Sequence, residues 1–111
     1  ENEFAGRQSQ TMELKTNSTA GTMESSDIMI MLEPRTEGGI ELELTSSVMQ
    51  QFGKQIERVI KDTLKELGVA SAVVNAVDKG ALDCTIAARV SAAAYRAAKR
   101  TDYVWNGGVN K

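Results

Sequence analysis

The stretch from Val48 to Leu67 constrains the fold most, because its apolar residues recur at helical spacing. Such a stripe is typical of a helix that packs on a sheet or on another helix. Ser47 and Gln50 match a capping box at its start, and Gly68 stands where a helix end favours a left-handed residue. The residues on the apolar face are Val48, Phe52, Ile56, Val59, Ile60, Leu64 and Leu67.

Patterns typical of β-strands flank this helix. Ile28–Leu32 is a short, continuous apolar run, whose length favours a buried strand. Residues 33–39 hold the only proline and a glycine pair, which indicates a turn. Residues 40–44 then alternate between apolar and acidic side chains, as in a strand with one wet face. We expect these two strands to form an antiparallel hairpin, and residues 73–77 predict a third strand.

An alanine-rich segment follows, with apolar residues on one helical face from Leu82 to Ala97. Alanine is the strongest helix former, so a second helix is expected, although a strand from Leu82 to Val90 also fits. The predicted order is β-β-α-β-α. It indicates a small, single α+β domain whose helices pack on a mainly antiparallel sheet.

Composition narrows the function classes. A chain of 111 residues with 41% hydrophobic and 25% charged residues is typical of one globular domain. The net charge of −2 lacks the basic footprint of a nucleic-acid-binding protein. No apolar run approaches the length of a membrane span, and the first residues lack a signal-peptide pattern. A cytoplasmic location is therefore expected, without nucleic-acid or membrane partners.

The chain has no histidine and one cysteine, Cys84. It therefore lacks the commonest general base and the commonest zinc ligand, and it cannot assemble a Ser-His-Asp or Cys-His nucleophile. We expect no catalytic and no metal-binding residues. Cys84 is interpreted as a small core residue. The basic residues of the last segment, Arg89 among them, are expected to lie on a solvated helix face.

The ends of the chain are polar. Residues 1–11 are expected to be a remnant of expression, with Met12 as the natural start. Residues 12–27, rich in Thr, Ser and Gly, predict a flexible N-terminal arm. The folded domain is then expected to span residues 28–100, followed by a loose tail at 101–111.

Two short motifs are informative only in combination. Residues 20–27 read Ala-Gly-Thr-Met-Glu-Ser-Ser-Asp, and residues 77–84 read Val-Asp-Lys-Gly-Ala-Leu-Asp-Cys. Either one alone is ordinary loop composition. In this order, with the 28–32 run, Ser46-Ser47-Val48 and Gln51-Phe52-Gly53, the chain resembles the acyl carrier (gamma) subunit of citrate lyase. The resemblance begins near Met12 and reaches the alanine-rich helix.

The resemblance implies a covalent site at Ser25. In this family, a serine of a Gly-Thr-Leu/Met-Glu-Ser-Gly/Ser-Asp motif carries 2'-(5''-phosphoribosyl)-3'-dephospho-CoA through a phosphodiester. Ser25 matches that serine, whereas the position of Ser26 need not be serine. Glu24 and Asp27 are expected to be solvated, so that their repulsion of the phosphodiester is small. The group can be missing from recombinant protein.

The resemblance also implies a reaction cycle in which this chain is a carrier without catalytic residues of its own. The alpha subunit would exchange an acetyl group on the arm for citrate. The beta subunit would cleave the citryl thioester to oxaloacetate and restore the acetyl thioester. A prosthetic-group transferase and an acetate-ligating activator are further expected partners.

Other functions stay open. The carrier of citramalate lyase would use a similar arm, and this chain alone does not separate the two substrates. The malonate decarboxylase carrier is more distant, because the Asp-Lys-Gly-Ala-Leu-Asp-Cys stretch argues against it. A fatty-acid carrier is disfavoured by the strand patterns and by the lack of an Asp-Ser-Leu tripeptide. An interaction module without a prosthetic group is the alternative from another class.

Overall fold

The computed structural model describes residues 12–98 of the chain. The α+β class is confirmed, but a strand precedes those expected, so this part of the chain begins with three strands. Its elements are β1 (Ser18–Gly21), β2 (Ile28–Pro34), β3 (Ile40–Ser46), α2 (Met49–Glu66), β4 (Ala72–Asp78) and α3 (Asp83–Ala98).

The strands form one mixed sheet in the order β1-β2-β4-β3. β2 is antiparallel to both β1 and β4, whereas β3 is parallel to β4. The predicted hairpin of β2 and β3 is therefore wrong, because β4 lies between them. The composition explains this order: β4 is mostly apolar and suits the sheet interior, while Glu41 and Glu43 make β3 suitable for an edge.

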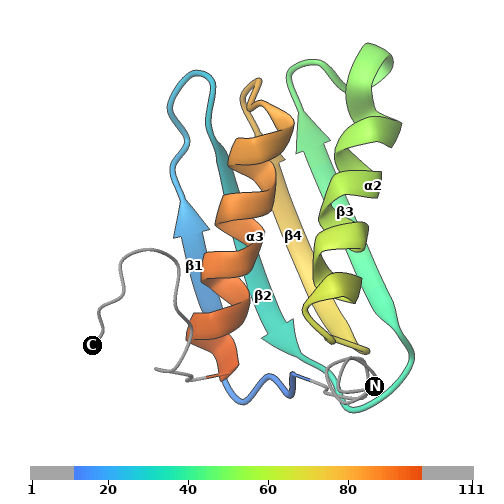
Figure 1. The fold of residues 1–111 in the computed structure, drawn as a ribbon. Helices are drawn as coiled ribbons and strands as arrows, with labels where there is room; N and C mark the ends of the chain where they lie inside the picture. The colour runs from blue at the N-terminus through green and yellow to red at the C-terminus, as the bar shows by residue number, and fades with distance from the viewer. Residues whose placement is uncertain (1–11, 99–111) are drawn as a thin grey trace, which may run out of the picture.

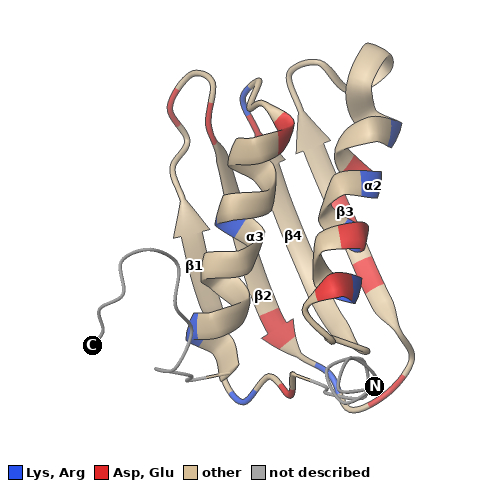
Figure 2. Ribbon diagram, in the orientation of Figure 1, with Lys and Arg blue, Asp and Glu red and all other residues tan. Residues whose placement is uncertain are grey.

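Both helices lie on the same face of the sheet, and the core lies between the two layers (Figure 1). The register shows how the strands supply it. Ala20, Ile30, Ala76 and Leu44 are aligned across the four strands, and all are buried or half-buried. The strand residues between them point to the other face, where charged and polar residues are frequent on β3. Figure 2 shows the charges of α2 on its outer side.

Helix α2 keeps most of the predicted apolar face. Its buried residues include Ile56, Ile60 and Leu64, and Gly68 adopts φ +86° after the helix, as predicted. The predicted capping box is wrong: α2 is preceded by Val48, without a side-chain cap. The Ser46 hydroxyl instead accepts a hydrogen bond from the Val48 amide, at 3.0 Å.

The alanine-rich segment is a helix, which decides between the helix and strand alternatives. Its buried face is made largely of alanine and consists of Ile86, Val90, Ala93, Ala94, Ala97 and Ala98. Small side chains let a helix backbone approach the sheet closely, and α3 indeed packs on β1 and β2.

The prediction of a flexible arm at residues 12–27 is wrong. Met12 and Leu14 are buried in the core, and residues 18–21 form β1. The backbone amide of Met12 donates to the carbonyl of Gly68 at 2.9 Å, and that of Lys15 donates to Ala97 at 2.8 Å. The signal that was overlooked is the presence of Met12, Leu14 and Ala20, apolar residues within an otherwise polar stretch. The predictions for residues 1–11 and 101–111 lie outside the described residues.

None of the helices described between residues 12 and 98 is long and apolar enough to cross a membrane.

Candidate functional site

The two sequence motifs meet at one end of the sheet. The loop between β1 and β2 and the loop between β4 and α3 both lie at the upper end in Figure 1, where α2 and α3 also begin. The amide of Ser26 donates to the carbonyl of Lys79 at 2.8 Å, and the amide of Lys79 donates to the carbonyl of Asp27 at 2.8 Å. Segments about 50 residues apart in the sequence are thus joined through their backbones.

Ser25 occupies the tip of a tight turn. The Asp27 amide donates to the carbonyl of Glu24 at 3.1 Å, which closes a four-residue β-turn. Ser25 is exposed, and within residues 12–98 no hydrogen bond engages its hydroxyl. The turn therefore presents a free hydroxyl group to the solvent.

Ser26 follows in the turn with φ +65°, alone among the described non-glycine residues in having a positive φ. The third position of a type II turn requires such an angle and favours glycine. A glycine at this position would therefore fit the turn as well. Ser26 is also exposed, but its role in the turn is conformational.

Gly21 is required where the chain leaves β1. Its φ is +96°, and a Cβ atom there would lie 1.8 Å from the carbonyl oxygen of Ile28. No side chain fits without a backbone shift. The next residue, Thr22, ties the loop internally: its hydroxyl donates to Asp27 Oδ2 at 2.7 Å and accepts from the Glu24 amide at 3.2 Å.

Asp27 holds the turn to helix α3. Its buried carboxylate accepts two hydrogen bonds from Arg89, Nε to Oδ1 at 3.0 Å and Nη2 to Oδ2 at 2.9 Å. It also accepts from the Ile28 amide at 2.7 Å. The guanidinium group of Arg89, followed by the Thr22 hydroxyl, holds the pKa of Asp27 well below its usual range. The pair raises the pKa of Arg89 in turn.

Two predictions about these residues are wrong. Asp27 is buried rather than solvated, and Arg89 is an ion-pair partner rather than part of a solvated face. Sequence reasoning missed the pair because its members are 62 residues apart, and nothing local to either residue marks the partner. Only the meeting of the two loops brings them together.

A second buried carboxylate shapes the neighbouring loop. The side chain of Asp78 is fully buried. It accepts hydrogen bonds from the Gly80 and Ala81 amides, both at 3.0 Å, and from the Ser46 hydroxyl at 2.9 Å. Through these bonds Asp78 joins the end of β3 to the loop before α3.

A groove of about 590 Å³ opens beside this loop, between the first turns of the two helices. It is lined by Val48, Phe52, Gln55, Ile56, Gly80, Ala81, Leu82, Asp83 and Cys84. Cys84 is exposed, so its interpretation as a core residue is wrong. The reason is its position in the first turn of α3, before the buried face begins at Ile86.

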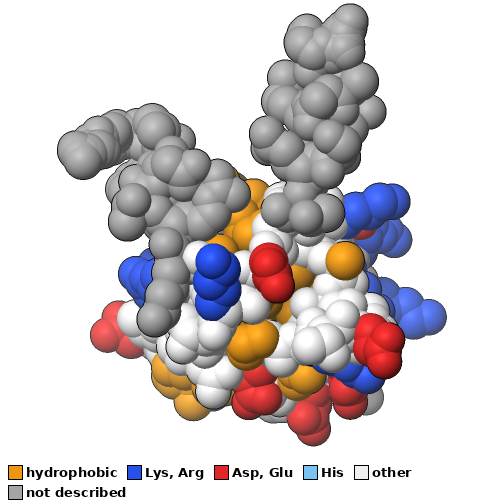
Figure 3. Space-filling view, turned by 90° about the horizontal axis from the view of Figure 1, so that it is seen from below, with side chains coloured by type: hydrophobic (Ala, Val, Ile, Leu, Met, Phe, Trp, Pro, Cys, Tyr) orange, Lys and Arg blue, Asp and Glu red, His pale blue; other side chains and the backbone are white. Residues whose placement is uncertain are grey.

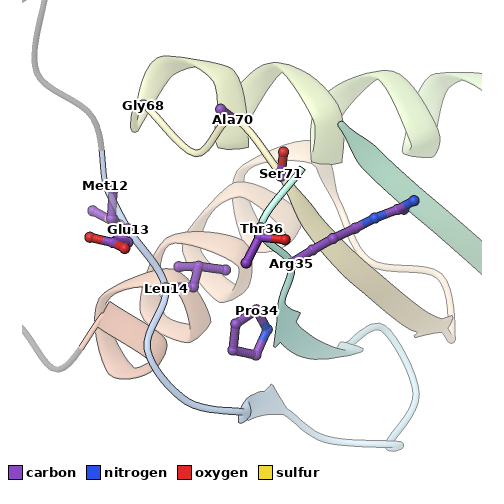
Figure 4. A pocket seen from close by; sticks show the side chains of 9 residues that line it. All are labelled: Met12, Glu13, Leu14, Pro34, Arg35, Thr36, Gly68, Ala70 and Ser71. Atoms are coloured by element: carbon purple, nitrogen blue, oxygen red, sulfur yellow. The ribbon is translucent and has the colours of Figure 1, made fainter. Parts of the chain in front are cut away.

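Another pocket lies at the opposite end of the sheet, far from Ser25. Figure 4 shows its lining from three segments: residues 12–14, residues 34–36 and the connection from α2 to β4. Seen from this end, hydrophobic side chains are interspersed with charged and polar ones (Figure 3). Arg35 is paired with Glu41 at 2.7 Å, and the pocket has no contact with either motif.

The site can present a hydroxyl group but offers no means to activate it. The Asp27 carboxylate is occupied by Arg89 and two further donors, so it is a poor general base. Among the described residues, no group of three or more Cys, Asp or Glu side chains could hold a metal ion. An exposed serine at the tip of an anchored turn does fit a covalently attached group, since another enzyme can reach it.

Comparisons with known proteins identify the relatives of this chain. Residues 15–97 match the family model described as malonate decarboxylase delta subunit. The chain is 55% identical to the citrate lyase acyl carrier protein of Fusobacterium nucleatum over 92 residues, which cover 83% of this chain and 98% of that protein. It is 52% identical to the citrate lyase acyl carrier protein of Klebsiella pneumoniae over 95 residues, 86% of this chain and 98% of that one.

A solved structure shares the fold. A chain of the Pseudomonas malonate decarboxylase hetero-tetramer superposes with a TM-score of 0.66, over 78% of this chain and 88% of that chain, at 15% identity. The family-model match and the sequence identities, each over most of the chain, decide the relationship. The chain belongs to the citrate lyase acyl carrier protein family.

Proposed function

We propose that this chain is the acyl carrier subunit of citrate lyase and that Ser25 carries the phosphoribosyl-dephospho-CoA arm. The observation that supports this most is the placement of Ser25 at the tip of a turn, exposed and with a hydroxyl free of hydrogen bonds within the described residues. A transferase can reach this oxygen, and the attached arm would extend into solvent. When bound, the group supplies a thiol that carries acyl groups as thioesters.

The residues around Ser25 position the arm and leave catalysis to the partners. Asp27 and Arg89 fix the base of the turn, while Ser26 gives it its shape. A fixed attachment point and a long arm raise the effective concentration of the thioester at each partner site. The proposed partners are the alpha and beta subunits, the transferase and the acetate-ligating activator, in the cytoplasm.

Intact-mass measurement after co-expression with the transferase tests the attachment. The wild-type chain should gain the mass of the arm, and Ser25→Ala should gain nothing. Ser26→Ala is the matched control, because it removes the neighbouring hydroxyl and should still be loaded. Equal loading of Ser25→Ala and wild type would overturn the assignment, and no loading of wild type would favour an interaction module.

The substrate is tested in the assembled complex. Loaded and acetylated carrier, mixed with the alpha and beta subunits, should release oxaloacetate from citrate. The names of the related citrate lyase carriers favour citrate. Turnover of citramalate without turnover of citrate would assign the chain to a citramalate lyase instead.

A further inference from the structure

We propose that the groove between the first turns of α2 and α3 binds the pantetheine part of the arm carried by Ser25. This rests on the proposed function. It adds a resting place for the arm on the carrier itself.

The groove lies next to the attachment turn. One of its walls is formed by residues 80–84, which directly follow Lys79, and the Lys79 carbonyl accepts the hydrogen bond that fixes Ser26. An arm attached to Ser25 therefore starts close to the mouth of the groove, and its pantetheine part, which follows the ribosyl phosphate and the adenosine diphosphate, would fold back into the groove. Such tethering gives a high effective concentration, so weak contacts suffice to hold the arm.

Exposed apolar side chains gather at this end of the molecule. The large hydrophobic residues exposed among those described are Met23, Met49, Phe52 and Leu82. All of them lie in the Ser25 loop or at the start of a helix. Phe52 (47% exposed) and Leu82 (72% exposed) line the groove itself. Clustered apolar exposure of this kind marks a binding surface, and the groove volume is in the range of small-molecule sites.

Polar groups in the groove match the amides of pantetheine. Leu82 precedes α3, and its side chain lacks an oxygen to cap the first amides of this helix, which belong to the groove residues Asp83 and Cys84. Those N–H groups can donate to amide carbonyls. Gln55 Nε2 donates to Asp83 at 3.0 and 3.1 Å across the two helices, and its amide oxygen can accept from an N–H group. The dimethyl group of pantetheine would contact Phe52 and Leu82.

A tethered chain suits this site better than a partner protein does. The surface is a hollow between two helices, and a narrow, flexible chain fills a hollow with little ordering cost when it is already attached. In the groove, the thioester would be shielded from water until a partner subunit draws the arm out.

Chemical shifts of the backbone amides, compared between unloaded and loaded protein, test the proposal. Loading is first verified by intact mass. The expected shifts extend beyond residues 22–27 to Phe52, Gln55 and residues 81–84. The double variant Phe52→Ser with Leu82→Ser should confine them to the turn. Met49→Ser is the matched control, because Met49 is exposed at the same end but does not line the groove.

Cross-linking gives an independent readout. In loaded protein, diamide should oxidise the arm thiol and Cys84 to an internal disulfide, each thiol losing one hydrogen to the reagent. We expect this reaction to be about tenfold faster in wild type than in the double variant. A Cys84→Ser, Ala70→Cys variant, with the thiol in the connection between α2 and β4, should cross-link slowly.

The outcomes separate this proposal from the proposed function. Loaded protein with shifts only in residues 22–27 would overturn the groove and leave the attachment at Ser25 standing. The groove would also be overturned if the double variant weakened binding to the alpha subunit without changing the loaded spectrum, because the surface would then be a docking site for that subunit. Absence of any added mass would overturn both proposals.

Discussion

Replacing Arg89 by methionine should loosen the Ser25 turn without disturbing the core. Arg89 lies on α3 and donates two hydrogen bonds to the Asp27 carboxylate. Methionine keeps the unbranched stem but removes both donors. Asp27 would remain in place with its bonds from Thr22 and Ile28, but without its counter-charge.

The loss of unfolding free energy expected for Arg89→Met lies between two limits. Exposed ion pairs contribute about 0–1 kcal/mol, whereas breaking a buried pair costs about 3–5 kcal/mol. The Asp27 side chain is only 12% exposed, while that of Arg89 is 40% exposed. Hydrogen bonds to charged groups contribute about 1.5–3 kcal/mol. We therefore expect Arg89→Met to lower the free energy of unfolding by about 2 kcal/mol.

Urea unfolding measures this cost, and the control is Arg96→Met on the same helix. Arg96 is exposed and donates to a neutral backbone carbonyl, that of Thr19 at 2.6 Å, so its loss should cost less than about 1 kcal/mol. A double-mutant cycle with Asp27→Asn isolates the pair. Equal effects of Arg89→Met and Arg96→Met, or additive effects in the cycle, would refute the reasoning.

Further outcomes follow from the same geometry. The pKa of Asp27 is lowered in the folded protein, so the stability that it contributes is present above its unfolded pKa of about 3.9 and is lost as the pH falls below that value. In acid unfolding, the difference in stability between wild type and Arg89→Met should therefore shrink below pH ~4. Gly21→Ala should cost more than about 3 kcal/mol in urea unfolding, since its Cβ would meet a backbone carbonyl oxygen; wild-type stability would contradict the required glycine. Ser26→Gly should raise stability by up to about 1 kcal/mol and keep loading intact, because it relieves a positive φ; a loss of stability would contradict the assigned turn.

The elements were largely predictable because hydrophobic spacing is a local property. The helical spacing of apolar residues in α2 and the apolar runs of β2 and β4 each indicate their own secondary structure. Strand order was not predictable in the same way. β3 pairs with β4 because β4 fits the sheet interior better than β3 does. That preference depends on segments far apart in the sequence and cannot be read from either strand alone. β1 was missed because its four residues, Ser18–Gly21, include just one buried apolar side chain, Ala20.

The candidate site was predictable only where its signal is local. The motif around Ser25 was recognised from the sequence, and the turn explains the residues that surround it. The ion pair of Asp27 and Arg89, and the use of both motifs at one end of the sheet, were not predictable. Both depend on the crossover through α2, which returns β4 to a position beside β2.

The central claim is that the arm is attached to the Ser25 oxygen. Fragmentation mass spectrometry of the peptide that contains residues 20–27, isolated from the loaded protein, tests this most directly. We expect the phosphodiester to stay with Ser25 and Ser26 to be unmodified. A phosphodiester on Ser26, or on any residue outside this turn, would contradict the claim.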